Sequence, residues 1–97
     1  MALHKRNYKG QSDWQAIAEL IQADDHFYHR VDFSWRLCST SLEDGRNAAV
    51  WEDENGNMQA FAALQFPWLT LDYAINPTVR NWDLEMDIIG WADARLR

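Results

Sequence analysis

The chain has 97 residues, and its net charge of −6 at pH 7 argues against non-specific nucleic-acid binding, which needs a basic surface. This length allows one domain with a modest core, and no apolar run reaches the roughly 18 residues that cross a membrane. The single cysteine, Cys38, excludes an internal disulfide, and without a secretory signal after Met1 we expect a cytoplasmic protein with no membrane partner.

The first quarter of the chain predicts a short strand and an amphipathic helix. Residues 5–9 form a polar strand suited to the edge of a sheet. Ser12 and Gln15 have the spacing of a capping box, which predicts that Ser12 caps a helix over residues 12–23. The apolar face of this helix is expected to carry Trp14, Ile17, Ala18 and Ile21.

A polar loop over residues 24–30 and a second helix over residues 34–42 are predicted next. The carboxylates and imidazoles of this loop could share a metal ion, but their spacing is loose and a fourth partner is missing. We therefore predict an ordinary polar loop without a metal site at Asp24, Asp25, His26 and His29. Cys38 lies in an apolar stretch and is predicted to be buried rather than nucleophilic.

Three antiparallel strands and a helix account for the rest of the chain. A strand over residues 47–52 leads into Asn55-Gly56, a strong hairpin signal, and residues 58–65 form the return strand. Apolar and polar residues alternate over 69–75, which predicts a further strand. From Trp82 a helix follows, with a predicted apolar stripe of Leu84, Ile88, Ile89, Ala92 and Leu96.

This order of elements resembles the N-terminal part of the GNAT (Gcn5-related) N-acetyltransferase superfamily. The resemblance implies an α+β fold, β-α-α-β-β-β-α, with a mainly antiparallel sheet and packed helices. Residues 1–97 would form a single GNAT-like domain, truncated after the third helix. The fifth strand, which makes the cofactor slot in the family, and the elements after it have no counterpart, so we expect an incomplete domain.

The turn between the last strand and the last helix carries the resemblance. In the family it reads Q/R-x-x-G-x-G/A and binds the pyrophosphate of acetyl-CoA, as strand-to-helix turns can. Arg80 occupies the Q/R position, whereas Asp83 and Glu85 occupy the two small positions. These carboxylates would repel phosphate and fill the space that glycine leaves open, so we predict a degenerate loop. An alternative interpretation is that they simply favour the start of a helix, and under both interpretations the phosphate site is weakened or lost.

By resemblance, the cofactor-binding segment would consist of Tyr73, Ala74, Ile75, Arg80, Asn81, Trp82, Asp83, Leu84 and Glu85. Acetyl transfer also needs a base that deprotonates the amine. Asp72, opposite the apolar face of its strand, is the candidate, although a solvated surface aspartate is the commoner case. The acceptor side would be formed by Phe27, Tyr28 and His29.

Two functions stay open from the sequence. The first is an acetyltransferase that moves acetyl from acetyl-CoA to a small-molecule or peptide amine. The second is a non-catalytic, degenerate GNAT-like module that acts as a structural or dimerisation partner, as a homodimer or beside a second GNAT-like domain. The degenerate loop favours the second. An unpaired edge along residues 69–75, near Trp68, Trp82 and Trp91, further predicts self-association.

Overall fold

The structure is a computed structural model that describes residues 3–24, 40–66 and 70–97. Its centre is a four-stranded sheet in the order β1-β2-β3-β4, in which every neighbouring pair is antiparallel. The strands are β1 (His4–Asn7), β2 (Ala48–Glu52), β3 (Met58–Gln65) and β4 (Thr70–Ile75). The α-helices are α1 (Trp14–Ala23) and α3 (Trp82–Leu96), and the 3₁₀ turns are η1 (Gly10–Asp13), η2 (Thr40–Glu43) and η3 (Gly45–Asn47).

The α+β fold class predicted from the sequence is confirmed, and the elements fall close to their predicted positions. The predicted edge position of the first strand is confirmed, because among the described strands β1 pairs with β2 alone. Most of the helix predicted over residues 34–42 lies outside the described residues, and its described end is the 3₁₀ turn η2. Among the described residues, the helices are too short or too polar to cross a bilayer.

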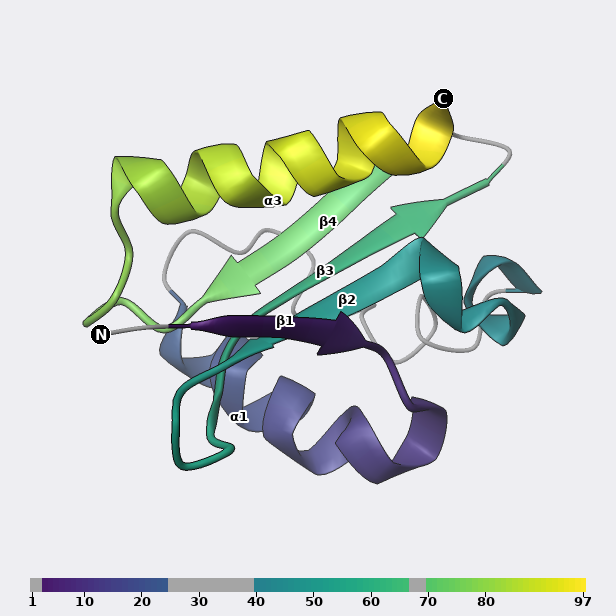
Figure 1. Cartoon of the computed structure of the whole chain (residues 1–97). Helices are drawn as coiled ribbons and strands as arrows, with labels where there is room; N and C mark the ends of the chain where they lie inside the picture. Colours follow the sequence, from purple (N-terminus) through teal and green to yellow (C-terminus); the bar gives the residue numbers. More distant parts are fainter. Residues whose placement is uncertain (1–2, 25–39, 67–69) are drawn as a thin grey trace.

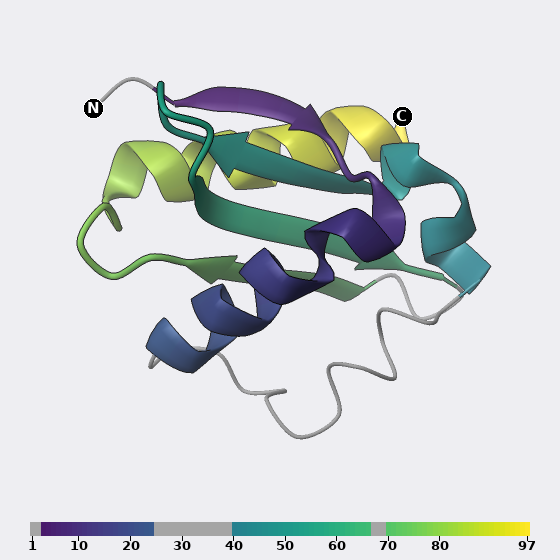
Figure 2. The same ribbon diagram turned by 90° about the horizontal axis from the view of Figure 1, so that it is seen from below.

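The sheet lies between the two helices, with α1 on one face and α3 on the other (Figures 1 and 2). Side chains alternate between two cores because successive residues of a strand point to opposite faces. Phe61 and Ala63 of β3 join Ile17 of α1 in one core. Ala60 and Ala62 join Ile88 of α3 in the other core. Because both faces of β3 are covered, its small residues let the helices pack close to the sheet.

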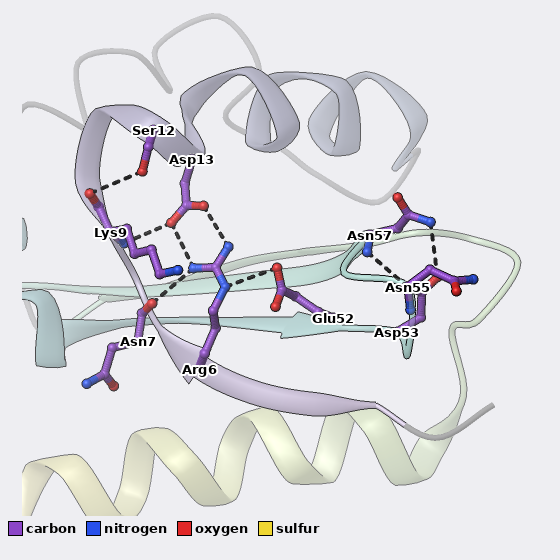
Figure 3. Close-up of polar contacts among 9 residues, drawn as sticks. All are labelled: Arg6, Asn7, Lys9, Ser12, Asp13, Glu52, Asp53, Asn55 and Asn57. Carbon is purple, nitrogen blue, oxygen red and sulfur yellow. Dashed lines mark hydrogen bonds and ion pairs between the residues drawn. The ribbon is translucent and has the colours of Figure 1, made fainter.

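The hairpin between β2 and β3 forms at the predicted Asn55-Gly56 pair. Gly56 has a φ of 82°, a left-handed conformation that glycine adopts without steric cost. Asp53 stabilises the turn, because its Oδ1 accepts from the N–H groups of Asn55 and Asn57 at 2.9 Å each. Figure 3 shows these contacts at the end of the hairpin. The local sequence alone therefore fixes this connection.

The predicted capping box is wrong. The helix α1 begins only after η1, and Asp13 occupies its N-cap position without a side-chain capping bond. Ser12 Oγ instead donates to the Lys9 carbonyl at 3.5 Å, a weak contact (Figure 3). Asp13 makes the strong bonds, accepting from Lys9 N–H at 2.8 Å and from Arg6 Nη2 at 2.7 Å. A charged acceptor beside an arginine outcompetes a serine hydroxyl for control of the turn.

The apolar stripes of both helices are shifted from their predicted positions. In α3, Leu84, Ile88 and Ala92 are buried as predicted, whereas Ile89 and Leu96 are exposed. In α1, the buried residues are Ile17, Leu20 and Ile21, whereas Ala18 is exposed. The sheet therefore covers a narrower part of α3 than the sequence predicted.

Replacing Asp13 with asparagine should destabilise the fold by about 1.5–3 kcal/mol at neutral pH, the range for hydrogen bonds to charged groups. Burial alone favours the neutral acid, but the Arg6 guanidinium and Lys9 N–H outweigh it and lower the pKa of Asp13 below its ordinary 3.8. The ionised carboxylate therefore stabilises the fold fully above pH 3.8, and this contribution is lost as the pH falls through the lower folded pKa. Urea unfolding of both proteins across this range measures the difference.

Ser12→Ala is the matched control for this prediction. It should change the free energy of unfolding by less than about 0.5 kcal/mol, whereas loss of a true N-cap costs about 1 kcal/mol. If Ser12→Ala lowered the free energy of unfolding more than Asp13→Asn does, the result would show that Ser12 caps α1 after all.

Candidate functional site

The turn after β4 is built around Asn76. Its backbone N–H donates to the Gln59 carbonyl at 2.9 Å, which continues the pairing with β3 by one residue. Its side-chain Oδ1 accepts from Thr78 N–H at 3.2 Å, and its carbonyl accepts from Val79 N–H at 3.0 Å. These local bonds reverse the chain at the end of β4 and direct it toward the start of α3.

The N-terminus of α3 is capped by Asn81, whose Oδ1 accepts from Leu84 N–H at 2.8 Å. Asp83 and Glu85 lie in the first turn of this helix, where the helix dipole favours negative charge. This position fits the alternative interpretation of the two carboxylates, as residues that favour the helix start. Trp82 and Asp83 are exposed beside the cap.

The guanidinium of Arg80 is held between two carboxylates. Its Nη2 donates to Asp24 Oδ2 at 2.8 Å, and its Nη1 donates to Glu85 Oε1 at 2.6 Å. Its Nε is buried and has no hydrogen-bond partner in the described part of the chain. The arginine in the Q/R position is therefore already paired within the chain.

Asp24 is the residue that the sequence interpretation missed. Its side chain is fully buried, and its Oδ2 accepts from the backbone N–H of Ile75 at 2.8 Å as well as from Arg80. It directly follows α1, at a helix C-terminus where the dipole disfavours a carboxylate. A carboxylate at this end of a helix is the sequence signal that could have indicated a cationic partner for Asp24.

This network occupies the groups with which the turn could otherwise bind an anion. The outward N–H of Ile75 and the charge of Arg80 are the groups that a strand-to-helix anion site would offer, and both are taken by Asp24. Asp83 and Glu85 add two more carboxylates beside the same helix start. An incoming phosphate would have to displace Asp24 and Glu85 from Arg80, and separating the buried Asp24 from this cation is costly.

The predicted base, Asp72, does not lie on a solvated face. It is buried, and it lies on the same side of β4 as Ala74, which packs in the α1 core. In the sheet it is paired with Ala63 of β3. The expectation of a solvated aspartate was wrong because α1 covers that face of the sheet.

The other predicted site residues fall into two groups. Tyr73, Ala74 and Ile75 form the end of β4, and Ala74 and Ile75 are fully buried. The predicted acceptor contacts, Phe27, Tyr28 and His29, lie outside the described residues. Within residues 3–24, 40–66 and 70–97, no three histidine, cysteine or acidic side chains are grouped closely enough to hold a metal ion.

The structure is similar to a crystal structure of a protein provisionally described as a phosphinothricin N-acetyltransferase, with a TM-score of 0.58 and 21% sequence identity. The match covers 97% of this chain and 66% of that protein, so the chain spans slightly less than two thirds of its length. At this identity the likeness shows the fold, which is that of the GNAT acetyltransferases. No protein-family model and no curated protein match the chain.

Asp24→Ala should destabilise the chain by up to about 3–5 kcal/mol, the range for breaking a buried ion pair, because it also removes the acceptor of the Ile75 N–H. Glu85→Ala removes the other carboxylate from Arg80, but this pair is more exposed, so its loss should cost less than about 1 kcal/mol. Urea unfolding of the two variants measures both values. Equal losses would show that Asp24 has no special role in the fold.

Proposed function

We propose that this chain is a non-catalytic module of the acetyltransferase superfamily, which acts as a structural or dimerisation partner. The observation that carries the proposal is the Asp24 carboxylate, bonded to both Ile75 N–H and Arg80. In the resembled family, this strand and turn hold acetyl-CoA. Here the corresponding groups stabilise the fold instead. A cytoplasmic location is part of the same proposal.

The composition of the turn supports the same conclusion. Asp83 and Glu85 stand where the family has small residues that allow the backbone to approach the pyrophosphate. A phosphate at this helix start would face both carboxylates in addition to Asp24, with Arg80 as the nearby cation already paired. We therefore infer that the loop is degenerate and that the dipole of α3 is offset by its own acidic first turn.

A second candidate function is acetyl transfer from acetyl-CoA to an amine. The fold of the N-acetyltransferase-like neighbour supports it, and so does the burial of Asp72, because a carboxylate shielded from water can act as a general base. In that case residues 73–75 would hold the cofactor arm, Arg80 would have to exchange its carboxylates for phosphate, and Phe27, Tyr28 and His29 would contact the amine.

Calorimetric titration with acetyl-CoA decides between the two candidates. We expect no binding tighter than about 1 mM, which corresponds to roughly −4 kcal/mol, because the cationic and N–H donors of the turn are occupied. A micromolar dissociation constant would refute the non-catalytic proposal. The matched variant Asp83→Gly/Glu85→Gly removes the repulsion while leaving Asp24 in place. If this variant also fails to bind, Asp24 is the group that closes the site.

A turnover assay tests the role of Asp72 independently. With acetyl-CoA and a panel of primary amines, the unmodified chain and Asp72→Asn should release free thiol at the same background rate. Loss of a working general base typically lowers the rate by about 10²–10⁴-fold. Turnover by the unmodified chain that falls by this factor in Asp72→Asn would establish the second candidate.

A further inference from the structure

The helix α3 has two apolar faces, and within the described part of the chain only one of them is covered. Leu84, Ile88 and Ala92 are buried against the sheet. The opposite face exposes four large side chains, with exposed fractions of 73% for Trp82, 43% for Met86, 44% for Ile89 and 50% for Leu96. We call these four residues the outer stripe of α3.

The spacing of the outer stripe is that of a helix-pairing seam. Together with Asp93, its members follow one another at intervals of four, three, four and three residues. At about 3.6 residues per turn, this spacing keeps all five positions within a narrow band along the helix. A seam of alternating three- and four-residue steps is the pattern by which one helix packs along another. The pattern therefore indicates a helical partner.

Gly90 gives a second, independent indication. A glycine inside a helix costs about 1 kcal/mol relative to alanine. A Cβ added at Gly90 would meet no atom within 4 Å, so packing within the described chain does not require a glycine there. Gly90 follows Ile89 and therefore lies about 100° around the helix from it, at the flank of the outer stripe and midway along its length. A missing side chain at this point lets a second helix approach closely.

The charges of α3 specify the direction of that partner. Asp83 lies in its first turn and Arg97 at its C-cap. Two parallel copies would bring Asp83 against Asp83 and Asp93 against Asp93, and like charges repel. Two antiparallel copies separate these pairs and bring the acidic end of one helix to the other's C-terminal end, where Arg97 makes only an exposed pair with Asp93 among the described residues and can also face Asp83 of the second copy. The helix is therefore complementary to an antiparallel copy of itself.

We propose that the outer stripe of α3 is a homodimer interface, in which two copies of this chain pair their α3 helices antiparallel about a two-fold axis near Ile89 and Gly90. This inference rests on the proposed structural role and deepens it by naming its surface and partner. It also differs from pairing along the β4 edge, because the Ile75 N–H on that edge is already bonded to Asp24.

Sedimentation equilibrium over a range of protein concentrations tests the interface. The unmodified chain should show a reversible equilibrium between 11.4 kDa and twice that mass, and Ile89→Asp should be monomeric throughout. Ala18→Asp is the matched control, because it adds the same charge to an exposed position of α1 and should dimerise like the unmodified chain. A monomeric unmodified chain, or an Ile89→Asp variant that still dimerises, would overturn the proposal.

Disulfide cross-linking tests the direction of pairing. With Cys38→Ser as background, Ile89→Cys should cross-link efficiently because the two copies of position 89 meet near the axis. Leu96→Cys alone should not cross-link, whereas Trp82→Cys/Leu96→Cys should. Efficient cross-linking through Leu96→Cys alone would show parallel pairing and overturn the antiparallel arrangement.

The variant Gly90→Ala distinguishes an effect on the dimer interface from an effect on the stability of α3 itself. The new methyl group should raise the melting temperature of the monomer, measured at high dilution, and at the same time weaken dimerisation. An unchanged dimerisation constant would refute the close approach at Gly90. All three experiments measure association and not cofactor binding. A monomeric chain would therefore overturn the dimer interface without affecting the acetyl-CoA titration. Tight acetyl-CoA binding would overturn the non-catalytic proposal without affecting the association measurements.

Discussion

A buried carboxylate joins three parts of this fold at one point. Asp24 directly follows α1, accepts the N–H of Ile75 in β4, and pairs with Arg80 in the turn before α3. Because this carboxylate is fully buried at the unfavourable end of a helix dipole, its pairing with the arginine offsets part of the cost of burial. The relative positions of the two helices and the edge strand thus depend on one charged contact as well as on apolar packing.

That contact limits what the strand-to-helix turn can bind. An anion site needs free N–H groups and an uncommitted positive charge. Here Ile75 N–H and Arg80 serve the fold, and the first turn of α3 carries two further carboxylates. We propose that a turn committed to its own fold in this way lacks the uncommitted positive charge that a phosphate requires. Under this proposal, the GNAT fold is retained without the chemistry that the turn performs in the resembled family.

Local rules predicted those parts of the fold that depend on neighbouring residues. The Asn55-Gly56 hairpin and the helix start at Trp82 follow from turn chemistry and apolar spacing, and both lie where the sequence placed them. The role of Asp24 could not be predicted in this way, because its partners lie 51 and 56 residues away. Likewise, the presence of Arg80 in a motif position does not tell whether its guanidinium is free.

The helix α3 shows the same limit for apolar residues. Its sequence interleaves two apolar faces, so periodicity indicates a helix without telling which face meets the sheet. The prediction merged Ile89 and Leu96 with the buried residues Leu84 and Ile88, and only the topology separates them. Leu84 and Ile88 are buried against the sheet, whereas the outer stripe of the same helix remains exposed to solvent. The regular spacing of these large exposed residues is the basis on which we propose that α3 associates with a second helix.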